Sequence, residues 1–141
     1  MNLSRRNILA IGGAAVTVSL IPVDFAMATP EAAAEALNAF TGGAAVGDGG
    51  IELVAPEIAE NGNTVPISVS APGAVAIMIL SEGNPSPGVA TFTFGEGAAG
   101  TAATRIRLAG TQNILAVAKM ADGSFVQAAR AVKVTIGGCG G

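Results

Sequence analysis

The chain has 141 residues with 10 acidic and 7 basic side chains, and its formal net charge of −3 argues against nucleic-acid binding, which needs a basic patch. It contains no His, Trp or Tyr and one Cys, so no Ser-His or Cys-His nucleophile pair, no imidazole metal ligand and no disulfide within the chain can form. Because only 12% of the residues are charged and 50% are hydrophobic, we expect an exposed apolar face that meets a partner protein.

Residues 1–28 have the three parts of an export signal. Arg5 and Arg6 form the basic start, an apolar stretch follows, and Ala26-Met27-Ala28 fits the A-x-A cleavage pattern. The run SRRNIL around the two arginines resembles a twin-arginine signal. We therefore expect a periplasmic mature chain that begins at Thr29. The stretch is only moderately apolar, so we expect no permanent membrane anchor.

A short helix is predicted next. Thr29 can cap it, Pro30 suits its first turn, and Gly42 with Gly43 ends it. Its apolar face would consist of Ala33, Leu37 and Phe40. Residues 42–50 are rich in glycine and are interpreted as a linker.

From residue 51 the hydrophobic period changes to two, which predicts strands. The expected strands are residues 51–55, 65–69, 74–80, 90–94, 105–108, 114–120 and 125–136. Pro66 suggests an edge strand, and the continuous apolar run 74–80 suggests a central one. Asp122-Gly123 predicts a hairpin with a two-residue loop.

These strands favour an all-β fold, an immunoglobulin-like antiparallel β-sandwich of about seven strands, in one domain over residues 29–136. Phe92, Phe94 and Phe125 are expected in its core. In the last strand one face would hold Val126, Ala128, Val132, Val134 and Ile136, and the other Gln127 and Lys133. Arg130 falls on the apolar face, so we interpret it as the mark of a bulge or of an interface.

The segment 137–141 reads Gly-Gly-Cys-Gly-Gly and contains the only cysteine, Cys139. Since Gly137, Gly138, Gly140 and Gly141 carry no side chains to bury, we expect a flexible arm that presents a reactive sulfur. Three extended residues reach about 10 Å at 3.3–3.6 Å each, enough to place the sulfur inside a partner's cleft. No basic residue lies nearer in sequence than Lys133 to activate the thiol.

The twin-arginine-like signal, the small sandwich and the GGCGG segment together resemble the SoxY family, sulfur-carrier subunits of the bacterial Sox thiosulfate-oxidation system. The resemblance implies that Cys139 carries sulfur intermediates covalently, and that the chain is not an enzyme and holds no cofactor. It also implies a heterodimer with a SoxZ-like subunit. A c-type cytochrome would load thiosulfate and a manganese hydrolase would release sulfate. In some organisms a sulfane dehydrogenase with molybdenum and haem would oxidise the remaining sulfur.

Other functions remain open at this point. The main alternative is an exported structural or adhesive domain that dimerises through a disulfide between two copies of Cys139. A ubiquitin-like sulfur carrier ending in Gly-Gly is disfavoured because the βαβ pattern is missing. Asp48, Glu52, Glu57 and Glu60 do not have the spacing of a calcium loop, so we interpret them as a solvated face and predict no metal site.

Overall fold

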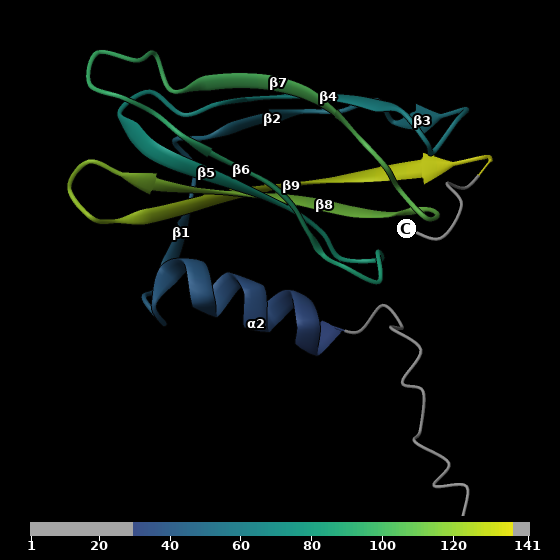
Figure 1. Cartoon of the computed structure of the whole chain (residues 1–141), viewed down its shortest axis with the longest axis horizontal. Coiled ribbons are helices and arrows are strands. Elements are labelled where there is room, and N and C mark those ends of the chain that lie inside the picture. The colour runs from purple at the N-terminus through teal and green to yellow at the C-terminus, as the bar shows by residue number, and fades with distance from the viewer. Residues whose placement is uncertain (1–29, 137–141) are drawn as a thin grey trace, which may run out of the picture.

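The computed structural model describes residues 30–136, which form two packed β-sheets and one helix (Figure 1). The larger sheet has the order β1-β9-β8-β5-β6, with β3 also paired to β9, and the smaller has the order β2-β4-β7. The all-β sandwich is therefore confirmed. The elements are α2 (Pro30–Thr41), β1 (Val46–Asp48), β2 (Glu52–Val54), β3 (Ile58–Ala59), β4 (Val65–Ser70), β5 (Ala74–Ser81), β6 (Gly88–Thr93), β7 (Thr101–Ile106), β8 (Gln112–Met120) and β9 (Phe125–Val134).

The seven predicted strands correspond to β2 and β4 to β9, and two further strands were missed. β1 pairs with β9 in parallel, Val46 opposite Phe125, and β3 does so with Ile58 opposite Lys133. The linker interpretation of residues 42–50 is therefore wrong where β1 lies, and the sandwich is not purely antiparallel. Both strands are too short to show a hydrophobic period in the sequence. They are recognised as strands only from their pairing with the edges of β9.

The strand β5 is apolar on both faces because both faces are covered. The main core, between the two sheets, covers one of them. Ile77 and Ile79 point inward and are fully buried in the main core. Met78 and Leu80 are 7% and 0% exposed and lie on the opposite face of the strand, outside that core. Leu80 lines a pocket together with Ala33 and Leu37 of α2. The prediction of a central strand is confirmed, since β5 lies between β8 and β6.

The helix forms a third layer on the outer face of the larger sheet (Figure 1). It ends as predicted at Gly42, which has a φ of 65° and donates its N–H to Asn38 O at 2.8 Å. The rings of Phe40 and Phe125 meet edge to face with centroids 5.8 Å apart. Phe125 thus belongs to the helix layer, whereas Phe92 and Phe94 pack half-buried against the main core.

The edge-strand prediction from Pro66 is wrong, because β4 lies between β2 and β7. The register gives the reason. β2 ends at Val54, opposite Ser68, so Pro66 lies beyond the end of β2. No strand on that side needs the N–H that proline lacks.

The hairpin between β8 and β9 is confirmed, but four residues, 121–124, separate the two strands, so the two-residue prediction is wrong. Met120 N donates to Ser124 O at 2.8 Å and Gly123, with φ 86°, donates to Met120 O at 3.0 Å. Asp122 Oδ1 accepts from the Ser124 hydroxyl at 2.6 Å and from its N–H at 2.9 Å, which together hold the pKa of that carboxyl below its ordinary value.

In the last strand, the bulge alternative for Arg130 and the placement of Ile136 on the buried face are wrong. The register of β9 with β8 is continuous past Arg130, which lies opposite Ile114, so Arg130 marks no bulge. Its side chain is exposed, and the interface interpretation remains a prediction. Ile136 is 66% exposed and does not share the buried face, because β9 ends at Val134.

Candidate functional site: the anchor of the cysteine arm

Cys139, the flanking Gly137, Gly138, Gly140 and Gly141, and the export arginines Arg5 and Arg6 lie outside the described residues. The described chain reaches Ile136, three residues before the cysteine. The contacts of residues 133–136 therefore determine where the cysteine arm, residues 137–141, begins. Figure 1 shows the tip of β9 beside β3, at the end of the molecule where α2 starts.

One edge of β9 is held by β3 and the residues around it. Lys133 N donates to Glu57 O at 2.9 Å, and Thr135 N donates to Ala59 O at 3.0 Å. The Thr135 hydroxyl donates to Glu60 O at 3.2 Å. The chain is thus hydrogen-bonded for one residue beyond the end of the strand.

The loop after β3 makes the last described contact. Gly62 N donates to Ile136 O at 2.7 Å, while Gly62 O accepts from Leu108 N at 2.7 Å. Leu108 is fully buried in the main core. Asn61 Oδ1 accepts from Asn63 N at 3.0 Å and so shapes this turn. Ile136 is therefore connected to the core through one residue, Gly62, whose N–H and C=O bond to Ile136 and Leu108.

The opposite edge of β9 is held by a side chain. The last backbone pair with β8 joins Gln112 to Val132. Beyond it, Val134 N donates to the Thr111 hydroxyl at 2.9 Å, and that hydroxyl lies 3.4 Å from Val134 O. One hydroxyl thus serves both backbone groups of Val134.

A buried amide holds the loop that carries Leu108 and Thr111. Asn84 is 4% exposed, donates to Arg107 O at 2.8 Å and accepts from Ala109 N at 2.9 Å. Its Oδ1 also accepts from Gln112 Nε2 at 2.9 Å. Because these bonds are largely removed from water, they fix the loop and with it the two residues that hold the end of β9.

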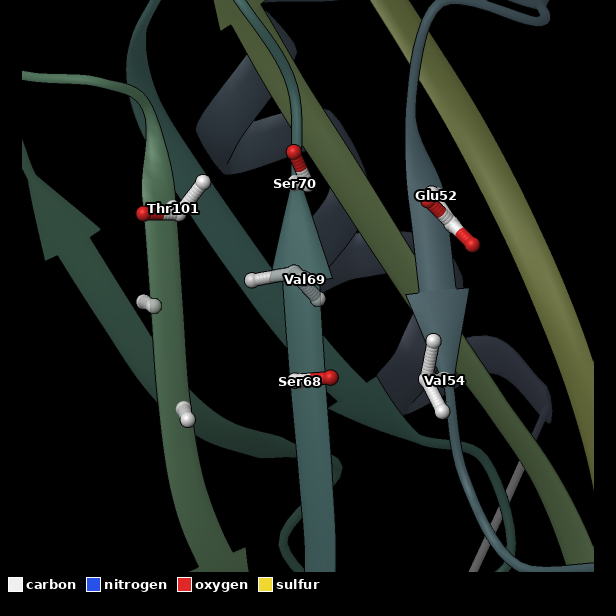
Figure 2. A pocket seen from close by; sticks show the side chains of 8 residues that line it. Glu52, Val54, Ser68, Val69, Ser70 and Thr101 are labelled. Carbon is white, nitrogen blue, oxygen red and sulfur yellow. The ribbon is translucent and has the colours of Figure 1, made fainter.

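The described residues offer little for catalysis. Residues 30–136 contain no group of three His, Cys, Asp or Glu side chains that could hold a metal ion. A shallow hollow of about 350 Å³ lies on the outer face of the smaller sheet, where Glu52, Val54, Ser68 and Thr101 point out of β2, β4 and β7 (Figure 2). Glu52 is the one ionisable side chain among the lining residues, which include no lysine, arginine or histidine, so the hollow offers no pair of acid and base side chains.

The sequence predicts the arm, which lies outside the described residues, but it does not predict the contacts that hold the end of β9. Thr111 and Thr135 are exposed hydroxyl residues near strand ends, and nothing in their local pattern distinguishes them from surface threonines. The one available signal is the pair Asn61-Gly62, which is typical of a turn but does not show what the turn holds. Over the part of the chain that the structure describes, no helix is both long and apolar enough to cross a membrane.

Comparisons with known proteins agree with this architecture. The family model described as sulfur oxidation protein SoxY matches residues 37–139. The solved structure of the sulfur carrier protein SoxY from Chlorobium limicola f thiosulfatophilum is 36% identical, covers 77% of this chain and 100% of that chain, and has a TM-score of 0.68. A superoxide reductase (neelaredoxin) from Ignicoccus hospitalis is 17% identical, with 61% and 80% covered and a TM-score of 0.53, which shows a shared fold alone. A search of curated proteins returned no match.

The fold and the anchored strand define the class, a small β-sandwich domain whose last strand leads into a cysteine-bearing segment. The family match covers most of the chain and extends to Cys139 itself. The chain belongs to the SoxY family of sulfur oxidation proteins. Membership implies a SoxZ-type partner within a Sox system.

Proposed function

We propose that this chain carries thiosulfate-derived sulfur covalently on Cys139 and presents it to sulfur-oxidising enzymes of the periplasm. The observation that carries the proposal is the family match, which ends on the only cysteine of the chain. The carrier activity named for the relative from Chlorobium limicola supports it. The anchored end of β9 supports it too, since it gives the arm a defined origin at Ile136.

The loading step is a two-electron oxidation. The Cys139 Sγ forms a bond to the outer sulfur of thiosulfate, the thiol proton is released, and two electrons pass to a c-type cytochrome. In the next step a manganese hydrolase cleaves the adduct with water and releases sulfate, which leaves the outer sulfur on the cysteine. A sulfane dehydrogenase with molybdenum and haem then oxidises that remaining sulfur in organisms that possess one. The chain itself is a substrate in each step, which suits a domain without an evident catalytic base.

Export and partnership complete the proposal. We propose that residues 1–28, with Arg5 and Arg6, direct twin-arginine export of the folded chain. A SoxZ-like subunit without its own signal would travel with it as a heterodimer. The glycines on both sides of Cys139 let the arm enter narrow clefts, because they add no side-chain bulk.

The test is mass spectrometry of the intact protein after incubation with thiosulfate and the loading cytochrome. We expect one covalently bound thiosulfate on wild type and none on Cys139→Ser. The free energy of unfolding of Cys139→Ser should lie within about 0.5 kcal/mol of wild type, since the glycines on both sides of residue 139 carry no side chains to pack. A wild-type protein that forms disulfide dimers but never an adduct would refute the carrier proposal in favour of an adhesive domain.

A further inference from the structure

We propose that the unpaired middle of one edge of β9, residues 128–132, is a docking slot for an extended segment of a partner protein with one acidic side chain at its centre. These residues are called the β9 slot. The backbone of the slot pairs with the segment, and the guanidinium of Arg130 binds the carboxylate. The slot lies entirely within the described residues, so the proposal does not depend on the carrier function.

The slot exists because two short strands share one edge of β9 and leave its middle unpaired. β1 ends opposite Gln127 and β3 begins opposite Lys133, near opposite ends of β9 (Figure 1). Between them the chain passes to the smaller sheet, where β2 pairs with β4. Residues 128–132 therefore have no neighbouring strand on this edge, over a length of about 17 Å.

Ala129 and Ala131 present their backbone groups to the slot. Lys133 N and Thr135 N both donate to the β3 side of β9. Because the direction of the N–H and C=O groups repeats at every second residue of a strand, those of Ala129 and Ala131 point to the same edge. Both residues are exposed, as is Arg130 between them. Such a row of N–H and C=O groups is what an added strand pairs with.

Arg130 places a positive charge at this edge. It lies on the same face of β9 as Val132, which is fully buried in the main core, yet the Arg130 side chain is exposed. Its Nη1 donates to Ala129 O at 3.4 Å, and since that carbonyl points into the slot, the guanidinium lies beside it. No acidic side chain of residues 30–136 forms an ion pair with Arg130. The guanidinium therefore has donors left for a carboxylate.

The charges around the slot define its occupant. Asp48 ends β1 and Glu57 precedes β3, so acidic residues stand at both ends of the slot and a basic one at its centre. A carboxylate opposite Arg130 is attracted, whereas carboxylates at the ends are repelled. A second copy of this chain is disfavoured, because two-fold pairing of two slots places the two Arg130 side chains opposite each other. The occupant is therefore a segment of a different protein with a single, central acidic residue.

The test is an NMR titration of the protein with the end-capped peptide Thr-Val-Asp-Val-Thr and its matched control Thr-Val-Asn-Val-Thr, each up to about 5 mM. The aspartate peptide should shift the amide signals of Ala129, Arg130 and Ala131, and leave that of the buried Ile79 in β5 unchanged. It should bind about threefold more tightly than the asparagine peptide, as expected for an exposed ion pair.

Two substitutions of equal charge change test the role of Arg130. In Arg130→Gln the two peptides should bind equally. In Lys119→Gln, which removes a positive charge from an exposed position of β8, the threefold preference should remain. Equal binding of the two peptides to wild type, or loss of the preference in Lys119→Gln, would overturn the acidic occupant.

Ala131→Pro tests the backbone pairing. Proline removes one N–H from the slot and none from the β8 side, because the Ala131 N–H does not point to β8, so the variant should bind neither peptide. Binding by Ala131→Pro as tight as that of wild type would overturn the pairing. Wild-type amide signals that stay unchanged at the highest peptide concentration, or that shift only outside the slot, would overturn the slot itself, whether or not the proline variant folds.

Discussion

Replacing Phe40 by Ala tests whether α2 is an integral layer of the domain. The Phe40 ring meets the Phe125 ring edge to face, with centroids 5.8 Å apart and planes at 73°. Phe125 is 8% exposed and, among residues 30–136, is one of the five buried apolar side chains that lie outside the main core. The helix therefore shields an apolar sheet face that would otherwise be exposed to water.

The magnitude follows from the burial of the ring. A fully buried Phe→Ala change costs about 3–5 kcal/mol, and Phe40 is half-buried, so we expect a loss of about 2 kcal/mol. About 0.5–1.5 kcal/mol of this belongs to the edge-to-face pair beyond its area. For a domain of this size, about 4 °C of melting temperature corresponds to each kcal/mol, so Tm should fall by about 8 °C.

The assay is urea and thermal unfolding of the chain with and without the substitution. Phe40→Leu is the matched control, because it keeps the apolar side chain and loses only the ring pair. A double-mutant cycle with Phe125→Leu should give a coupling energy of about 1 kcal/mol. A Phe40→Ala variant within 0.5 kcal/mol of wild type, or a coupling energy near zero, would refute the helix layer as a stabilising contact.

Three further predictions address the arm, the hairpin and the core. Gly138→Pro should slow sulfur transfer to the hydrolase because proline fixes φ, whereas Gly138→Ala should slow it less; equal rates would show that the arm needs no such freedom. The lowered pKa of Asp122 means that wild type should be more stable than Asp122→Asn above pH 3.8, and this advantage should vanish as the pH falls through the lowered pKa, as measured by unfolding across pH. Ser81→Ala should stabilise the domain by up to about 1 kcal/mol, since the buried Ser81 hydroxyl has no hydrogen-bond partner, and destabilisation in urea unfolding would indicate a partner such as bound water.

The elements that were predicted from the sequence are those determined by residues close together in the chain. The hairpin before Phe125 was predicted from Asp122-Gly123, because glycine readily adopts the positive φ that such a turn needs. Gly123 has a positive φ in the structure. The strand β5 was predicted from a continuous apolar run. In the structure one face of β5 packs in the main core and the other lies outside it. The helix was predicted from its cap, its period and its glycine terminus.

The parts that sequence missed depend on tertiary pairing. The strands β1 and β3 have three and two residues and take their conformation from the edge of β9, to which they are parallel. Pro66 was misinterpreted because proline predicts an unpaired N–H but not how far the neighbouring strand β2 extends. In both cases the deciding residue is distant along the chain.

The candidate site shows the same contrast between local sequence signals and contacts that are distant along the chain. Cys139 was predicted as the site because its chemistry and its glycine neighbours are visible in the sequence, and this stays a prediction. Its anchor was not, because the Thr111 hydroxyl bonds a residue 23 positions away and the Thr135 hydroxyl bonds one 75 positions away. No pattern within a short window contains both members of either pair.

A carrier needs a sharp boundary between fixed and moving parts, and the observed contacts suit such a boundary. If residues 133–136 opened readily, the origin of the proposed arm would vary and a docked partner would meet the sulfur less often. Hydrogen bonds on both edges of β9, supported by the buried Asn84 network, place these residues on the stable side of the domain. The glycines that follow have no side chains with which to extend this anchoring, so the proposed motion begins at Gly137.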